Sequence, residues 1–399
     1  MSPLSTAPSR LTGQDARLRT AYLAEVVRTL YPAGAGDTGY LVLPHARRPR
    51  LLVPAGSRRA AAAAVRHFTE PGTRRARLAR HAAAAALRTG AAHALLPGRV
   101  RVELAGSVHP HLQELLESRL ALAVHIGPAR ANRKPVLQLL SPDGEPVGFA
   151  KLGTGPLTRA LVRAETAALT VLAELRLRQL TVPRLRHAGQ WRDHQLLVQS
   201  ALPVWRPRAS LHPLRLALAM RELAYSCGTT GSPLAHSPYW QRLHDRLTAL
   251  TDQPEAAALA TAAAALHTCD VPLRFGAWHG DWAPWNMAVL PETLLVWDWE
   301  RFDTGVPIGF DAIHYHLQCQ LRIRTGAPAA VAATLAAAGE LLAPFGVPAP
   351  ARGVTALLYL VDLAARYLAD RQAEAGARLG VLGSWLLPVL VRRLEELPC

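Results

Sequence analysis

The arrangement of hydrophobic residues along the chain constrains its fold more than any other feature. Short apolar runs typical of strands are concentrated before Pro203, whereas the segments after it show the spacing of amphipathic helices. The helical part is interrupted only once, from Trp278 to Asp311, where polar residues gather. The chain has 399 residues, 50% of them hydrophobic, so it can bury a sizeable core and exceeds the usual length of one domain. We therefore predict an α+β protein with a β-rich part followed by a mainly helical part.

The β-rich part is expected to contain two segments. In the first, helices are expected at 12–30, from Ser57, at 76–95 and from His111, with short strands starting at Tyr40 and Arg50. From Leu122 three strands follow, the last two joined by a turn at 142–145, and then a helix at 158–177 and strands at 185–191 and from His194. The sequence thus predicts an N-terminal α/β extension at 1–115, a small β-rich lobe at 116–203 and a helical lobe at 204–399.

Composition and charge exclude several function classes. No apolar run is long enough to span a membrane and the first residues lack the apolar core of a signal peptide, so we expect a cytoplasmic protein without a membrane partner. The net charge of +16 could attract nucleic acid, but the excess is almost entirely arginine in a chain rich in alanine and leucine. Because no zinc-finger, helix-turn-helix or RNA-binding signature accompanies it, we do not expect a nucleic-acid partner. The oligomeric state is not indicated.

The string HGDWAPWN, from His279 to Asn286, opens the interruption of the helical part. Two short apolar runs about a turn near Glu292 predict a hairpin that brings Asn286 and Asp298 to the same end of the ribbon. At that spacing both side-chain oxygens reach one cation. An all-oxygen pair suits Mg²⁺, which keeps waters and completes its octahedron with phosphate oxygens. Asp281 lies in the same loop and is expected to point toward a substrate hydroxyl.

This string and the later WDWE resemble the H-G-D-x-x-x-x-N and I-D-W-E motifs of the aminoglycoside phosphotransferase and choline kinase-like family, whose fold is similar to that of protein kinases. The resemblance implies that Asp281 is the catalytic base, and that Asn286 and Asp298 bind Mg²⁺ together with the phosphates of ATP. Asp311 resembles the aspartate that braces the catalytic loop in that family, and His279 is expected to support the same loop. The resemblance therefore implies a bilobal protein kinase-like fold.

A lysine and a glutamate upstream are expected to form an ion pair. Lys151 ends a predicted strand and is one of only two lysines in a chain that otherwise uses arginine. Glu165 follows on a predicted helix, on one apolar stripe with Leu161, Leu169 and Leu172. A carboxylate on such a stripe is rarely buried without a partner, and Lys151 is the natural one. The resemblance implies that this pair positions the α- and β-phosphates of ATP.

The chain departs from the family pattern between the first two strands of the β-rich lobe. The segment HIGPARANRKP contains only Gly127, so the glycine-rich motif that covers the nucleotide is missing. The backbone amides of residues 129–132, with Arg130 or Arg133, are the expected phosphate contacts in its place. By analogy with the family, Leu202 and its neighbours should form the hinge that contacts adenine.

Several residues near the expected site leave alternatives open. Glu300, two positions after Asp298, is either a second metal ligand or a surface acid. His314 and His316 face apart on a predicted helix, which favours packing over metal binding. Core packing is also favoured over a stacking platform for the aromatic residues Trp282, Trp285, Trp297 and Trp299.

The function predicted from these features is that of a small-molecule kinase. ATP and Mg²⁺ are the expected cofactors, and the partner is a small molecule whose hydroxyl group receives the γ-phosphoryl group. Lys151 would orient the nucleotide phosphates and Asp281 would deprotonate the acceptor. The alternative is a non-catalytic kinase-like module that binds a nucleotide or a partner. The sequence does not identify the acceptor or the role of residues 1–115.

Overall fold

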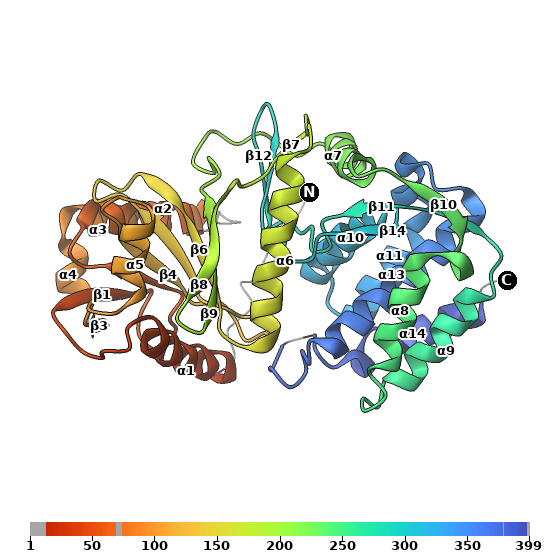
Figure 1. Ribbon diagram of the computed structural model, residues 1–399, viewed down its shortest axis with the longest axis horizontal. Helices are drawn as coiled ribbons and strands as arrows, with labels where there is room; N and C mark the ends of the chain where they lie inside the picture. The colour runs from red at the N-terminus through yellow and green to blue at the C-terminus, as the bar shows by residue number, and fades with distance from the viewer. Residues whose placement is uncertain (1–12, 69–73, 97, 378, 397–399) are drawn as a thin grey trace. The chain divides into compact units, whose positions relative to one another are not determined.

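The helices and strands of this chain group into two units. The computed structural model describes residues 13–68, 74–96, 98–377 and 379–396. Unit 1 comprises Met1–Thr166 and Pro183–Arg206, and unit 2 comprises Ala167–Val182 and Pro207–Cys399. Unit 1 is built on a large antiparallel sheet, whereas unit 2 consists mainly of helices with two small sheets (Figure 1). The predicted α+β class is confirmed.

The sheet of unit 1 has eight strands in the order β3-β1-β2-β4-β5-β6-β9-β8. Their bounds are β1 Thr38–Leu43, β2 Leu51–Pro54, β3 Arg99–Val102, β4 Ala121–His125, β5 Val136–Leu140, β6 Pro146–Gly153, β8 Leu185–Trp191 and β9 His194–Ser200. Strand β2 pairs with β4, so that Leu51 lies opposite His125. The strands of the first 115 residues therefore continue the sheet of β4, β5, β6, β9 and β8, and β4 has a partner on each side instead of an open edge.

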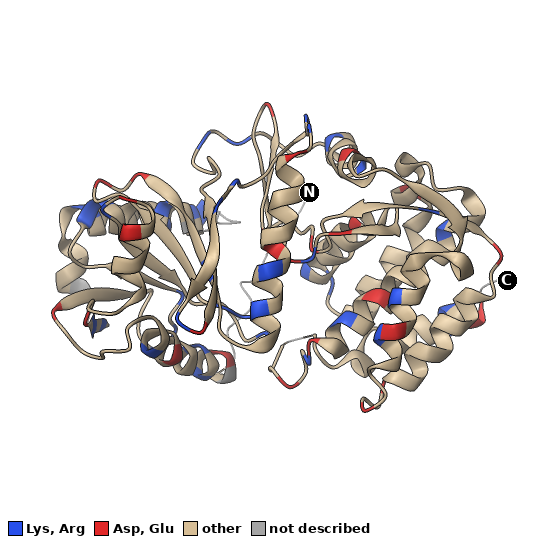
Figure 2. Cartoon of the chain, in the orientation of Figure 1, with Lys and Arg blue, Asp and Glu red and all other residues tan. Residues whose placement is uncertain are grey.

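Helices cover both faces of this sheet (Figure 1). They are α1 Gly13–Leu30, α2 Arg58–Phe68, α3 Arg74–Thr89, α4 Ala91–Leu95 and α5 Val108–Leu115. A further helix, α6 Pro156–Ala173, begins in unit 1 and ends in unit 2. Strand β4 shows the alternation that makes this possible, since Leu122 and Val124 join the core under α1 and α5. Ala121 and Ala123 point the other way and join the core under α2 and α3. Basic residues are spread along α1 and α3 (Figure 2).

The turn predicted between β5 and β6 is confirmed. The amide of Gly144 donates to the carbonyl of Ser141 at 2.9 Å, and the amide of Ser141 donates to the carbonyl of Glu145 at 2.9 Å. Gly144 has a φ of +91°, a backbone conformation that other L-residues rarely adopt. The glycine in the predicted turn is therefore required by the hairpin.

Unit 2 contains helices in the part of the chain after Pro203 where they were expected, among them α10, which leads out of the polar interruption. They are α7 Pro213–Ser226, α8 Pro238–Thr248, α9 Ala256–His267, α10 Phe310–Ile323, α11 Ala327–Ala336, α12 Ala338–Leu342, α13 Ala349–Ala369 and α14 Leu387–Glu395, with 3₁₀ turns at Leu234–His236, Ala343–Phe345 and Leu382–Ser384. Helix α13 buries an unbroken run of side chains from Val354 to Ala365, which is typical of a central helix.

Two three-stranded sheets accompany these helices. Their orders are β10-β11-β14 and β12-β13-β7. The bounds are β7 Leu180–Thr181, β10 Thr230–Pro233, β11 Pro272–Trp278, β12 Met287–Val289, β13 Leu294–Val296 and β14 Asp303–Pro307. Only the hairpin of β12 and β13 was predicted.

Among the described residues no single helix is long and apolar enough to cross a membrane. One pair of consecutive helical segments, Ala327–Ala336 and Ala338–Phe345, is together long and apolar enough, but it is bent.

Candidate active site

The polar string lies in a loop of unit 2 that joins β11 to β12. Gly280 has a φ of +81°, and a Cβ atom at this position would clash with the backbone carbonyl of Arg301. Both conditions require glycine, which explains the residue between His279 and Asp281. Arg366, from α13, donates from Nη1 to the carbonyl of Gly280 at 2.6 Å. The loop is thus held closely against two other segments of unit 2.

Asp311 fixes the start of the loop from the first turn of α10. Its Oδ2 accepts from the amide of His279 at 2.7 Å, and its Oδ1 accepts from the amide of Gly280 at 3.1 Å. The side chain is only 4% exposed. Burial raises the pKa of Asp311 to about 7, although the two amides favour the ionised form. These contacts are those expected of a residue that braces the loop.

His279 holds the following residue through its ring. Nδ1 accepts from the amide of Asp281 at 3.1 Å, so Nε2 carries the proton and donates to the carbonyl of Trp297 at 3.1 Å. Burial lowers the pKa of His279 to about 4, which keeps this neutral tautomer at physiological pH. The ring therefore ties the loop to the end of β13.

The carboxylate of Asp281 is held by two side chains. Asn286 donates from Nδ2 to Asp281 Oδ2 at 3.0 Å and to the Asp281 carbonyl at 2.9 Å. His314 places Nε2 3.1 Å from Asp281 Oδ1, while its Nδ1 lies 2.8 Å from the hydroxyl of Tyr359. The carboxylate can only accept, so Nε2 of His314 donates to it and Nδ1 accepts from Tyr359. Both carboxylate oxygens of Asp281 are thereby oriented.

The surroundings of Asp281 favour its ionised form. Burial opposes the charge, but the hydrogen bond from His314 and the positive charge of Arg366 outweigh burial and lower the pKa of Asp281. The pKa of His314 is also lowered, because burial outweighs its contact with Asp281. His314 is therefore a neutral donor, and Arg366 supplies the nearby positive charge.

The role of His314 was missed by the sequence reasoning, which compared it only with His316 and favoured packing. The signal that would have revealed it is its spacing from Asp311. The two residues lie three positions apart on α10 and thus share one face of the helix. Through that face, Asp311 holds the backbone of the loop and His314 holds the side chain of Asp281.

The hairpin after the loop has a register that differs slightly from the predicted one. Met287 lies opposite Val296, and the amide of Trp297 donates to the carbonyl of Asn286 at 3.0 Å. Asn286 therefore faces Trp297, and Asp298 lies one residue further along. Asp298 adopts a φ of +73°, which is uncommon for a residue other than glycine and indicates local strain.

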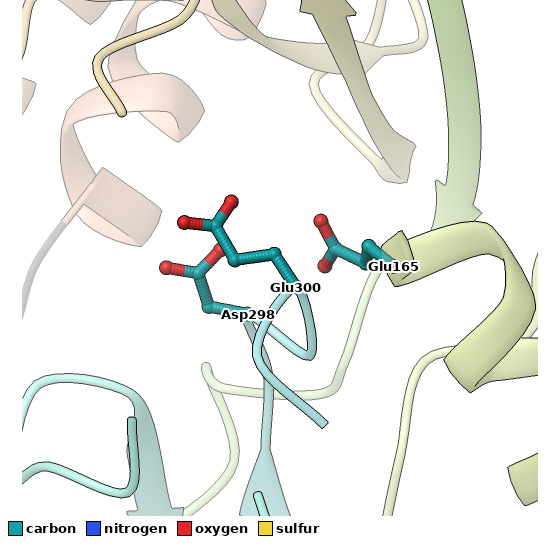
Figure 3. Close-up of side chains that lie close together, drawn as sticks. All are labelled: Glu165, Asp298 and Glu300. Carbon is teal, nitrogen blue, oxygen red and sulfur yellow. The ribbon is translucent and has the colours of Figure 1, made fainter. Parts of the chain in front are cut away.

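Asp298 and Glu300 bring two carboxylates together in unit 2. Oxygens of the two side chains lie within 4.8 Å of one another, and both side chains project from the segment after β13 (Figure 3). Glu300 is only 4% exposed, so it is not a surface acid. Two neighbouring carboxylates offer the oxygen ligands that Mg²⁺ prefers.

The expected packing of the tryptophans holds for two of the four. Trp282 and Trp299 are fully buried, and the ring of His279 lies 4.5 Å from that of Trp299. Trp285, in contrast, is 37% exposed. The buried tryptophans therefore pack the loop and support the position of His279.

Lys151 and Glu165 form an ion pair within unit 1. Nζ of Lys151 lies 2.7 Å from each of the two carboxylate oxygens of Glu165. Only 7% of the lysine side chain and none of the glutamate side chain is exposed. Glu165 projects from α6, as Figure 3 shows, and its neighbours on the predicted apolar stripe, Leu161 and Leu169, are buried as well.

Acidification should lower the stability of the protein. Burial lowers the pKa values of both His125 and His279 to about 4, whereas an unfolded histidine titrates near 6.5. Between these values the unfolded chain binds protons that the folded chain does not, so the free energy of unfolding falls as the pH drops. Asp311 acts in the opposite direction because its pKa is raised to about 7, but it is one group against two.

Urea unfolding measured between pH 7 and pH 4 checks this expectation. The midpoint should move to lower urea as the pH falls, and His125→Phe should flatten the dependence by removing one titrating group. A midpoint that stays constant or rises on acidification would contradict it.

No protein-family model matches this chain, and no curated protein matches it. Solved structures that are similar include a protein assigned as a fructosamine-3-kinase from Haemophilus somnus 129PT, with 11% identity over 73% of this chain and 97% of that chain and a TM-score of 0.47. A thermostable mutant of the aminoglycoside phosphotransferase APH(4)-Ia, in a ternary complex with ADP and hygromycin B, has 11% identity over 72% of this chain and 98% of that chain and a TM-score of 0.48. The amicoumacin kinase hAmiN, in complex with AMP-PNP, Ca²⁺ and Ami, has 10% identity over 67% of this chain and 86% of that chain and a TM-score of 0.39. The second of these structures is named as an aminoglycoside phosphotransferase, the group whose motifs the loop around Asp281 resembles.

Proposed function

We propose that this chain is a small-molecule kinase, which transfers the γ-phosphoryl group of ATP to a hydroxyl group of a small molecule with the help of Mg²⁺. The observation that carries this proposal is that Asp281 is held in one orientation and is ionised. Its backbone is fixed through His279 and Gly280, and its carboxylate is oriented by His314 and Asn286. A carboxylate that is both fixed and ionised is suited to align a hydroxyl group and accept its proton.

In this proposal the chain has a bilobal kinase-like architecture. The strands β4, β5, β6, β8 and β9 of unit 1 form the nucleotide-binding lobe, to which residues 1–115 add three strands and several helices. Unit 2 is the helical lobe that carries the catalytic loop and the metal ligands. Lys151 lies on the third strand of this lobe, as the phosphate-binding lysine of protein kinases does, which supports this assignment.

The donor set of unit 2 fits a hard divalent cation. Asp298 and Glu300 offer paired carboxylates, and Asn286 uses its amide nitrogen for Asp281, which leaves its amide oxygen as the ligand atom. Histidine and cysteine ligands, which zinc prefers, are not part of this set. When bound, Mg²⁺ neutralises charge on the phosphate oxygens of ATP.

The chain's own residues supply the remaining steps. Lys151, held by Glu165, contributes a compact positive charge for the α- and β-phosphates. The acceptor oxygen attacks the γ-phosphorus while the bond to the β-phosphate oxygen breaks and ADP leaves. Asp281 aligns the acceptor hydroxyl and takes its proton as the new bond forms. Most of the acceleration comes from positioning and from preorganised charges.

Transfer of labelled γ-phosphate from ATP tests the proposal. The purified chain is incubated with Mg²⁺ and a panel of hydroxylated compounds that includes aminoglycosides, sugars and amino-alcohols. We expect a phosphorylated product from at least one compound, and none when EDTA removes the metal. Label that stays on ATP across the panel, or that is transferred equally in EDTA, would contradict the proposal.

Replacing His314 should slow the chemical step without weakening nucleotide binding. In His314→Ala the Asp281 carboxylate loses the donor on Oδ1 and keeps the donor from Asn286 on Oδ2, so it is less firmly oriented and kcat should fall about tenfold to a hundredfold. The KM for ATP should not change. In His314→Gln the side-chain amide can still donate to Asp281, so most of the activity should return.

His316→Ala is the matched control, because His316 lies on the same helix and contacts Thr334 instead of the loop. The kcat and the KM for ATP are measured by steady-state kinetics for His314→Ala, His314→Gln and His316→Ala. Equal kcat values for the alanine variant of His314 and the wild-type chain would show that His314 only fills space.

A further inference from the structure

We propose that helix α1 fixes the loop between β4 and β5 in the conformation that binds the nucleotide phosphates, so that the N-terminal segment is part of the nucleotide site. This inference rests on the proposed function, because it assigns the loop to ATP. It gives residues 1–115 a role that their sequence does not indicate. Every contact that carries it lies within unit 1.

The start of the loop is held on both sides by the N-terminal segment. Arg19, on α1, donates from Nη1 to the carbonyl of Ile126 at 2.9 Å. The amide of the same residue, Ile126, donates to the carbonyl of Arg50 at 2.9 Å. Both backbone hydrogen bonds of the residue that leaves β4 therefore go to residues before position 115.

The cation that makes this contact is itself positioned. Arg19 is only 8% exposed, and its Nε donates to Oδ2 of Asp15, one turn earlier on α1, at 3.2 Å. A buried guanidinium that uses one nitrogen for a carboxylate and another for a carbonyl has little freedom to move. Ile126 also packs in the same core as Tyr22 and Val26 of α1.

The far end of the loop is held by an aromatic ring of the same helix. The guanidinium of Arg133 lies over the ring of Tyr22, 3.7 Å from its centroid, which is the geometry of a cation–π contact. Among the described residues, the Nη1 atom of Arg133 is buried and has no hydrogen-bond partner. A buried donor without an acceptor is costly, and a guanidinium matches a phosphate group well. This contact holds the far end of the loop against α1.

The loop leads into β5 opposite Lys151, which lies two residues before the end of β6. Val136, the first residue of β5, is paired with Lys151, and the amide of Leu152 donates to the carbonyl of Pro135 at 3.1 Å. Arg133 is therefore only a few residues from the pairing partner of Lys151. A phosphate chain bound near Lys151 meets this loop, which lacks the glycines that would let it wrap around the phosphates unaided. Contacts from α1 supply the fixed shape instead.

Two pairs of variants test this inference. Arg19→Ala removes the contact to Ile126, and Arg28→Ala is its control, because Arg28 is exposed on the same helix. Tyr22→Leu removes the ring under Arg133, whereas Tyr22→Phe keeps it. Hydrogen exchange of residues 127–133 is measured without nucleotide, and the Kd of Mg·ADP is measured by calorimetry.

We expect Arg19→Ala and Tyr22→Leu to speed exchange in the loop and to weaken Mg·ADP binding about fivefold to tenfold. The two control variants should match the wild-type chain. If circular dichroism shows that Arg19→Ala does not fold, the comparison of Tyr22→Leu with Tyr22→Phe tests the inference on its own. Folded variants that lose loop protection but keep the wild-type Kd would overturn this inference alone. A wild-type chain that binds no Mg·ADP would overturn the proposed function with it.

Discussion

Asp281→Asn should reduce phosphoryl transfer about 10²- to 10⁴-fold while the protein stays folded and keeps its affinity for Mg·ADP. An amide cannot accept the proton of the acceptor hydroxyl, so the general base is lost. The substitution is close to isosteric, and its Oδ1 can still accept from Nε2 of His314. Its Nδ2, however, would face Nδ2 of Asn286. The hydrogen bond from Asn286 to Oδ2 is then lost, because two amide donors face each other. The bond from Asn286 to the backbone carbonyl of residue 281 remains.

The measurement is single-turnover transfer of labelled γ-phosphate, with calorimetric binding of Mg·ADP beside it. Asp252→Asn is the control, because Asp252 is an exposed aspartate of unit 2 that pairs only with the exposed side chain of Arg371. It should behave as the wild-type chain does. If Asp281→Asn transferred phosphate at a rate within a few-fold of the wild type, Asp281 would not be the base and the proposed mechanism would be wrong.

The parts of the fold that could be predicted are those encoded by local patterns. The stripe that contains Leu161, Glu165 and Leu169 follows the helical period, and all three side chains are buried in α6 as that pattern requires. The turn at Gly144 follows from one residue that tolerates a positive φ. In both cases the information lies within a few positions of the element that it predicts.

Pairing between distant segments could not be predicted in this way. Strand β2 pairs with β4 across more than fifty residues, and no tight turn joins them, so local patterns do not indicate that both belong to one sheet. The short strands β10 and β14 contain glycine and proline and have few buried side chains, so they lack the alternation that marks a strand. Their pairing with β11 depends on the tertiary structure.

In the candidate site, too, local features could be predicted and contacts between distant segments could not. The hairpin was predicted from its two apolar runs, but its register is shifted, because the turn lies between Leu290 and Thr293 and is centred ahead of Glu292. Asp298 thus lies beyond the residue that faces Asn286. The contact between His314 and Asp281 depends on how α10 packs against the loop, which hydrophobic periodicity does not specify. Spacing identifies which residues share a face but not what that face meets.

The ion pair of unit 1 offers the second large effect. Lys151→Met removes the cation that lies 2.7 Å from both oxygens of Glu165, a carboxylate that is completely buried. Breaking a buried pair by removing one partner costs about 3–5 kcal/mol, because the charge that remains has lost its main compensation. We therefore expect both a marked loss of stability in urea unfolding and the loss of measurable Mg·ATP binding.

A double variant separates these two effects. In Lys151→Met/Glu165→Leu the buried carboxylate is gone as well, and replacing a buried pair by apolar residues of similar size is often close to neutral. The double variant should therefore recover most of the free energy of unfolding that the single variant loses. It should not recover nucleotide binding, because no side chain at position 151 is left to meet the phosphates. If the double variant bound Mg·ATP with wild-type affinity, the pair would serve the core of unit 1 and not the nucleotide. If the double variant stayed as unstable as the single variant, the destabilisation would come from lost packing around Lys151. It would then not come from the unpaired buried carboxylate of Glu165.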